Sequence, residues 1–281
     1  MDFLTLEQKY HIRREDPEHL ICSIPAAELL ERPNMQQFLE LYGTRIHALE
    51  PAASAAYFSG WLGYAAFAQQ YALSFHNQAL DLSLSNFVVQ LHVKESYTAI
   101  SFKLVREAAQ PAPAGEAERT AWLRRTLTEL YGTTFRPLLE AASEAAGIEV
   151  GQLWGQFPTK LNYLMDDLLA EAEEHELRER IAQDYNRLRQ ELNGEVFGRA
   201  KNPLDVKIRW MEDLKDPDKR IRMKNACCLY YRTEGGFCCY TCPRLTEEQR
   251  EERRTQARKT AIAQALSARA CHTKQKRNEG R

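Results

Sequence analysis

The chain has 281 residues, of which 44% are hydrophobic and 27% are charged, and its formal net charge is −1. This length is enough to bury a substantial core in one large domain or two ordinary ones. The near-neutral charge argues against a protein that binds nucleic acid or an anionic membrane through its overall field. The first residues lack the basic-then-apolar order of a secretory signal, so we expect a cytoplasmic protein.

The N-terminal part alternates between short strands and helices. Strand-like stretches occur in two pairs, each separated by a short polar turn: residues 9–14 with 19–24, and residues 86–93 with 97–105. The second pair alternates between apolar and polar residues, as a half-buried strand does. We expect two hairpins that together make one small antiparallel sheet.

A long uncharged stretch lies between these pairs. Residues 51–80 contain no Asp, Glu, Lys or Arg, and residues 52–68 are apolar or small. A membrane span needs about 20 predominantly apolar residues, whereas this run is shorter and is interrupted by Ser54 and Ser59. We therefore expect a central buried helix over residues 52–72 and no transmembrane segment. Its aromatic stripe is expected to be core: Tyr57, Trp61 and Tyr64.

The chain becomes strongly helical after a connector. Residues 106–118, rich in Ala, Pro and Gly, are expected to be flexible. Residues 246–270 are expected to form one exposed helix that opens with a capping box from Thr246 to Gln249, and residues 274–281 a disordered tail. The remaining expected helices are 28–49 with a break at Pro33, 116–131, 134–146, 149–169 and 171–193, with breaks at Gly132, Gly147 and Gly194.

These elements predict an α+β protein that is predominantly helical with a small antiparallel sheet. An exposed acidic helix is expected at residues 166–176, which hold six carboxylates and no Lys or Arg. We expect four parts along the chain, and the pattern also allows the first three to pack as one unit over residues 1–245. They are an N-terminal α+β part (1–110), a mainly helical part (111–222), a cysteine-rich loop (223–245), and a C-terminal basic helix and tail (246–281).

Five of the seven cysteines lie within residues 227–242. An odd number of cysteines in a protein without an export signal favours a metal site over a disulfide framework. Cys239 and Cys242 have the common Cys-x-x-Cys chelating spacing, but Cys227 and Cys228 are adjacent and do not form an ordinary zinc knuckle. A binuclear iron–sulfur cluster spreads its ligands over two irons, so the spacing favours [2Fe–2S] over zinc.

The residues around these cysteines suit a negatively charged cluster. Basic side chains flank the loop, Gly235 and Gly236 let the backbone approach the sulfur atoms, and aromatic side chains exclude water. The basic residues are Lys224, Arg232 and Arg244, and the aromatic residues are Tyr230, Tyr231, Phe237 and Tyr240.

The pattern Cys-Cys-x10-Cys-x2-Cys, formed by Cys227, Cys228, Cys239 and Cys242, resembles the C-terminal motif of the FhuF-like siderophore-iron reductases. The C-terminal third of the chain carries nearly all of this resemblance. It implies that the four cysteines bind a [2Fe–2S] cluster that passes one electron to siderophore-bound Fe(III). The implied protein is a cytosolic oxidoreductase with a ferric siderophore of hydroxamate or citrate type as substrate. No nucleotide-binding site is evident in the sequence, so a separate ferredoxin-type or flavin-dependent donor is implied.

Two details stay open. Cys238 adjoins Cys239, so the register Cys-Cys-x9-Cys-x3-Cys is an alternative in which Cys238 is a ligand; we prefer Cys239 because it preserves the Cys-x-x-Cys chelating spacing.

A basic pocket beside the cluster would attract an anionic siderophore. The candidate substrate residues are Lys224, Arg232, Arg244, Arg199, Lys201, Lys207 and Arg209.

The main competing interpretation is a zinc-stabilised four-cysteine module without redox activity, whose basic tail contacts protein or RNA. Residues 246–281 hold ten Lys and Arg against five Asp and Glu. In the preferred interpretation nucleic acid is not a partner, because such a charged helix is usually a solvated face. A Rieske centre is excluded because no histidine lies between Ala226 and Leu245. A thioredoxin-like dithiol lacks its βαβ context.

Overall fold

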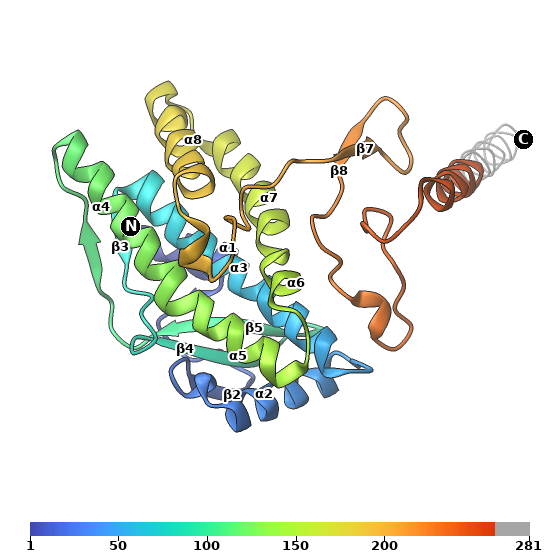
Figure 1. Cartoon of the computed structure of the whole chain (residues 1–281), viewed down its shortest axis with the longest axis horizontal. Helices are drawn as coiled ribbons and strands as arrows, with labels where there is room; N and C mark the ends of the chain where they lie inside the picture. The colour runs from blue at the N-terminus through green and yellow to red at the C-terminus, as the bar shows by residue number, and fades with distance from the viewer. Residues whose placement is uncertain (262–281) are drawn as a thin grey trace, which may run out of the picture. The chain divides into compact units, whose positions relative to one another are not determined.

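The computed structural model describes residues 1–261, which form an α+β fold made mostly of helices, as expected (Figure 1). The chain divides into two compact units. Unit 1 consists of Met1–Val206 and Ala226–Phe237, and unit 2 consists of Lys207–Asn225 and Cys238–Arg281. The chain therefore passes from unit 1 to unit 2 after Val206, returns to unit 1 at Ala226, and passes to unit 2 again after Phe237, within the cysteine region.

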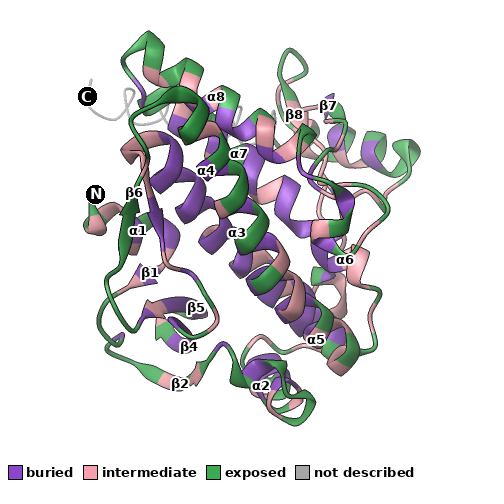
Figure 2. Cartoon of the chain, turned by 60° about the vertical axis from the view of Figure 1, so that its left-hand side comes forward, coloured by how far each residue is buried: buried purple, intermediate pink, exposed green. Residues whose placement is uncertain are grey.

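The centre of unit 1 is helix α3, Pro51–His76, which corresponds to the uncharged stretch of the sequence. Pro51 lies in its first turn, and Asn77, with a φ of 56°, ends it in the left-handed conformation. Most of its residues are buried (Figure 2), in contact with α1, α2, α5, α6, α7 and α8. No helix in the described part of the chain is long and apolar enough to cross a membrane.

The aromatic stripe on α3 differs from the expectation. Tyr57, Trp61 and Tyr64 are half-buried rather than core. Trp61 donates a hydrogen bond from Nε1 to the Tyr42 hydroxyl (2.8 Å), and the Lys160 ammonium lies 3.9 Å from the Tyr64 ring centroid. Small Ala and Ser residues make up much of the buried surface of α3, whereas these rings lie at its half-buried edge.

A four-stranded sheet has the order β1-β5-β4-β2. The predicted hairpin of residues 86–93 and 97–105 is confirmed as β4 and β5, which pair antiparallel. The predicted hairpin of 9–14 and 19–24 is wrong: β2 pairs antiparallel with β4, and β1 runs parallel to β5, so the sheet is mixed. The strands are β1 (Ile12–Arg13), β2 (Leu20–Pro25), β4 (Phe87–Lys94) and β5 (Tyr97–Leu104).

The reason for this difference lies in helix α1, Phe3–Tyr10. The side chain of Asp2 caps it by accepting a hydrogen bond from the Leu4 amide (2.9 Å), so the helix takes up the first residues of the predicted strand. Only two residues are left for β1.

The expected connector at 106–118 also contains a strand, because Ala109–Pro111 (β6) pairs antiparallel with Gln78–Leu80 (β3).

The remaining helices of unit 1 follow the sequence closely, with shifted ends. Pro33 does not break α2; it lies in the first turn. Gly132 is no break either, since a π-helical turn, Leu130–Phe135, joins α4 to α5, whereas Gly147 ends α5 with a φ of 61°. Gly155 separates α6 from α7. The helices are α2 (Arg32–Arg45), α4 (Glu116–Glu129), α5 (Arg136–Ala146), α6 (Val150–Trp154), α7 (Gln156–Glu171) and α8 (His175–Gln190), with 3-10 turns at Glu28–Leu30 and Gly194–Phe197.

The carboxylates of residues 166–176 are exposed, as expected, but they span the end of α7 and the start of α8 rather than one helix.

The core between the helices of unit 1 contains an aromatic cluster. Tyr131, Trp154 and Phe197 pack with ring centroids 5.2–6.3 Å apart and are almost completely buried.

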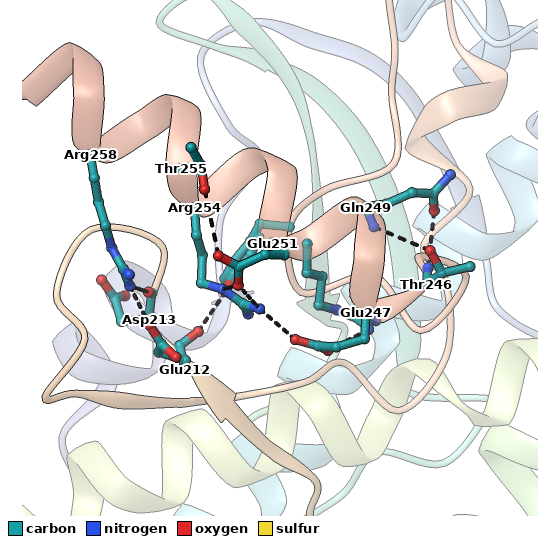
Figure 3. Close-up of polar contacts among 11 residues, drawn as sticks. Glu212, Asp213, Thr246, Glu247, Gln249, Glu251, Arg254, Thr255 and Arg258 are labelled. Atoms are coloured by element: carbon teal, nitrogen blue, oxygen red, sulfur yellow. Dashed lines mark hydrogen bonds and ion pairs between the residues drawn. The ribbon is translucent and has the colours of Figure 1, made fainter.

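Unit 2 is built from a hairpin and a helix. Strands β7, Trp210–Glu212, and β8, Arg220–Arg222, pair antiparallel, and residues 247–261 are helical. The predicted capping box is confirmed: the Thr246 hydroxyl accepts from the Gln249 amide (3.2 Å), and the Gln249 side chain accepts from the Thr246 amide (3.0 Å), as Figure 3 shows.

The expected exposure of this helix is only partly correct. Arg250 and Arg254 have relative exposures of 4% and 5%, so one face of the C-terminal helix (residues 247–261) is buried. The expected helical residues 262–270 and the tail 274–281 lie outside the described residues.

One buried ion pair in unit 1 gives a stability prediction. Asp184 on α8 is 1% exposed; it accepts two hydrogen bonds from the Arg119 guanidinium (2.7 and 2.9 Å) and one from the Ser74 hydroxyl (3.0 Å). Arg119→Met leaves this carboxylate buried without its cation, and should lower the free energy of unfolding by about 3–5 kcal/mol.

Urea denaturation measures this loss. Arg32→Met, which breaks an exposed pair with Glu144, is the control and should change the free energy of unfolding by less than about 1 kcal/mol. Equal, small effects of the two substitutions would contradict the prediction.

Candidate metal centre

The unit 1 part of the cysteine region begins with Cys227, which is 4% exposed. Its carbonyl oxygen accepts two side-chain hydrogen bonds, from Nε2 of Gln152 on α6 (2.5 Å) and from Nε2 of Gln156 on α7 (3.0 Å). Gly155 between these helices lets the segment approach, because a Cβ there would lie 2.5 Å from the Ala226 Cβ. Two side-chain amides thus fix the backbone at Cys227, and the close approach of this segment requires glycine at position 155.

The rest of this segment is folded back by local turns. Leu229 is buried and has a φ of 60°, and Gly235 has a φ of 68°. A Cβ on Gly236 would collide with the carbonyl oxygen of Tyr230, so glycine is required there. The backbone of 232–234 pairs with that of 47–49 through hydrogen bonds of 2.8–2.9 Å.

The unit 2 part is a tight turn from Cys238 to Cys242. The Cys242 amide donates to the Cys239 carbonyl (2.9 Å), which gives the Cys-x-x-Cys segment its turn, and Cys242 is 1% exposed. The Lys224 amide donates to the Thr241 carbonyl (3.0 Å). The Tyr240 hydroxyl donates to the Glu212 carbonyl (2.7 Å), which ties the turn to strand β7.

The three thiols of this turn have different surroundings. The Cys239 sulfur lies 3.7 Å from the Thr241 hydroxyl. The Cys238 thiol is hydrogen-bonded to Cys242, and its pKa is raised, first by burial and then by the neighbouring Cys242 thiol, while Arg244 and Arg253 act in the opposite direction. In unit 2, therefore, the Cys238 thiol lies near that of Cys242. This arrangement keeps the alternative register of the sequence open.

The four cysteines of the motif are divided between the units: Cys227 and Cys228 belong to unit 1, and Cys239 and Cys242 to unit 2. The cysteines of the region, Cys238 included, form no disulfide bond among the described residues. Among residues 1–261, no group of three or more His, Cys, Asp or Glu side chains is gathered as a metal site.

The basic residues proposed as substrate contacts are also divided. In unit 1, Arg232 forms an ion pair with Glu50, and Arg199 forms one with Glu149 (2.8 Å). Lys201 is exposed. Both arginine charges are therefore shared with carboxylates of unit 1 itself.

In unit 2, Arg244 is exposed and close enough to Cys238 to lower the pKa of that thiol. Lys207 and Arg209 are exposed, and the Arg209 guanidinium donates to the Lys224 carbonyl (3.3 Å). Among the candidates, Arg244 therefore lies near a cysteine of the region, Cys238.

Side chains that the sequence did not single out hold the cysteine backbone. Gln152 and Gln156 do so in unit 1, and Arg250 and Arg253 in unit 2, where they donate to the carbonyls of Cys242 (2.8 Å) and Cys238 (2.6 Å). The spacing of the arginines along one helix was a signal for a shared face. Gln152 and Gln156 gave no such signal in the sequence, because the carbonyl to which they donate lies 71 to 75 residues away along the chain.

Comparison with known proteins gives no relative: no protein-family model matches the chain, and no curated protein matches it in sequence.

The contact at Gly155 gives a second stability prediction. Gly155→Ala places a methyl group against Ala226 and should lower the free energy of unfolding by about 1–3 kcal/mol through overpacking. Gly60→Ala, in the middle of α3 with open space where the added methyl group would lie, should raise it by up to about 1 kcal/mol. Chemical denaturation of both variants checks the pair. A stabilised Gly155→Ala protein would show that the segment does not press on α6.

Proposed function

We propose that this protein is a ferric-siderophore reductase that acts in the cytoplasm. The observation that carries the proposal is the spacing of Cys227, Cys228, Cys239 and Cys242, in a region where the described cysteines are free of disulfides. The resemblance of this spacing to the FhuF-like motif supplies the substrate class. A protein thiol set of this kind is a ligand set for iron–sulfur clusters.

A [2Fe–2S] cluster as resident cofactor is supported by the number of cysteines and by how their backbone is held. Cys227 and Cys242 are nearly inaccessible to solvent, and side-chain donors hold the carbonyls of three cysteines in the region. The guanidinium of Arg250, buried beside Cys242, has an Nε atom without a hydrogen-bond partner among the described residues. A buried cation of this kind favours a negatively charged group nearby. When bound, the cluster would store the single electron that the reaction needs.

The reaction itself needs only electron transfer. Siderophore-bound Fe(III) gains one electron and becomes Fe(II), and a ferredoxin-type or flavin-dependent donor returns the electron to the protein. Hard oxygen ligands of hydroxamate or citrate type bind Fe(II) much less tightly than Fe(III), so reduction releases the iron. The part of the protein is to hold the thiols, exclude water from them and attract the substrate.

The charge of unit 2 suits an anionic substrate or donor. Its described residues, 207–225 and 238–261, include thirteen Lys and Arg against eight Asp and Glu, a net charge of +5. The positive charges of exposed Arg244 and of Arg253 both act on the Cys238 thiol and oppose the rise of its pKa. Such a field raises the local concentration of anions at low ionic strength and weakens with added salt.

Cysteine variants test the ligand set. Protein purified without oxygen should be reddish brown, with visible charge-transfer absorption, and Cys227→Ser or Cys242→Ser should remove the colour. Cys238→Ser should keep it, and this variant is the matched control for a cysteine in the same turn. Bleaching by Cys238→Ser but not by Cys239→Ser would replace Cys239 with Cys238 in the ligand set.

Single-turnover mixing tests the reaction. Dithionite-reduced protein, freed of excess reductant, should be reoxidised by ferric hydroxamate or ferric citrate, with one Fe(II) trapped by a ferrous chelator for each electron lost. The gallium complex of the same siderophore is the control and should leave the protein reduced. A colourless protein that contains zinc would contradict the proposal and favour the four-cysteine interaction module.

A further inference from the structure

The C-terminal helix carries four arginines on one face. Arg250, Arg253, Arg254 and Arg258 are spaced by three and four residues, which places them along one side of an α-helix. The side chains of Arg250 and Arg254 are only 5% and 6% exposed. Arginine is almost never fully buried unless it is paired, so this face has a specific partner.

The two arginines nearest the start of the helix bind the cysteine turn. Nη2 of Arg250 donates to the Cys242 carbonyl (2.8 Å) and lies 3.9 Å from the Met223 sulfur. Nη1 of Arg253 donates to the Cys238 carbonyl (2.6 Å). These carbonyls stand at the two ends of the turn, so the guanidinium groups hold both of its ends.

Arg254 and Arg258 bind the turn and the hairpin that supports it, and Figure 3 shows Arg258 beside Glu212 and Asp213. Arg254 donates to the hydroxyl of Tyr240 in the turn (3.1 Å), and Tyr240 in turn donates to the Glu212 carbonyl. Arg258 forms an ion pair with the Glu212 carboxylate and donates to the Asp213 carbonyl (3.3 Å). Helix, turn and hairpin are thus one bonded unit, all within unit 2.

The positive charges of this face are unequally compensated. Arg254 has two carboxylates at 2.6 Å, from Glu247 and Glu251, and Arg258 has Glu212. Among residues 1–261, the carboxylate paired with Arg250 is the more distant Glu247, with an oxygen at 3.4 Å. That carboxylate is held mainly by Arg254, which is the chief cause of its lowered pKa. The buried Nε of Arg250 has no hydrogen-bond partner in the described part of the chain. Arg250 is therefore a buried and incompletely compensated cation on the carbonyl of a proposed cluster ligand.

We infer that Arg250, with Arg253, positions the Cys238–Cys242 turn and raises the reduction potential of the cluster bound there, an inference that rests on the proposed function. A cluster with four thiolate ligands is negatively charged and gains one more negative charge on reduction. A fixed cation close to it stabilises the reduced form more than the oxidised form. Covalent reach places the Arg250 guanidinium within about 10 Å of the Cys242 sulfur, where one unit charge at an effective dielectric constant near 20 changes a one-electron equilibrium about tenfold.

A redox titration of the full-length, anaerobically purified protein tests this. In Arg250→Gln, the ratio of reduced to oxidised protein at a fixed potential should fall about tenfold, a shift of about 59 mV for a one-electron couple. Lys259→Gln is the matched control, because it removes one positive charge from the exposed face of the same helix and should change the ratio less than twofold. Arg250→Lys keeps the charge and should restore most of the wild-type ratio.

The outcomes separate this inference from the proposed function. A brown Arg250→Gln protein with the potential of Lys259→Gln would overturn the role of Arg250 and leave the reductase proposal standing. If Arg250→Gln binds no cluster, the half-buried Arg253 replaces it in the test. Arg253→Gln should then lower the ratio relative to Lys259→Gln, and an unchanged ratio would overturn the inference. A wild-type protein without iron and sulfide would overturn both proposals.

Discussion

The cysteine region depends on side-chain donors that bind the carbonyl oxygens of the cysteines themselves. Most of residues 226–242 lie outside helices and strands, so their backbone carbonyls do not find partners in regular secondary structure. Gln152 and Gln156 satisfy Cys227, Arg250 satisfies Cys242, and Arg253 satisfies Cys238. These bonds hold the backbone of the three cysteines in place through their carbonyl oxygens rather than through their sulfur atoms.

The two units use different chemistry for the same task. In unit 1 the donors are neutral amides on rigid helices, next to a glycine that permits close packing. In unit 2 they are guanidinium groups on the C-terminal helix, which bring positive charge together with the hydrogen bond. The positive charge next to the cysteine backbone is therefore found at the Cys238–Cys242 turn of unit 2.

The elements that follow local rules were predictable from the sequence. Period-two alternation identified β4 and β5, the uncharged stretch identified α3, and the Thr246–Gln249 pattern identified the start of the C-terminal helix. Strand pairing was less accessible. Whether β2 pairs with β1 or with β4 is decided by contacts between residues about 70 positions apart. The helix that Asp2 caps also takes up the first residues of the stretch 9–14, which was expected to be a strand.

The side chains that hold the cysteine carbonyls were missed in the sequence for a related reason. A glutamine that bonds a distant backbone carbonyl leaves no pattern in the sequence. The arginines did show a helical spacing. The net charge counted over residues 246–281 as a whole nevertheless indicated a solvated helix, because such a count does not separate one side of a helix from the other. The pairing of Arg254 with Glu247 and Glu251, three to seven residues away, is what makes burial of that side acceptable.

The central claim is that the cysteine quartet binds paired iron and inorganic sulfide. Quantitative metal and acid-labile sulfide analysis of protein purified without oxygen tests it most directly. The account predicts iron and sulfide in equal amounts, about two of each per chain, as the composition of a [2Fe–2S] cluster requires. One zinc per chain, with neither iron nor sulfide, would contradict it.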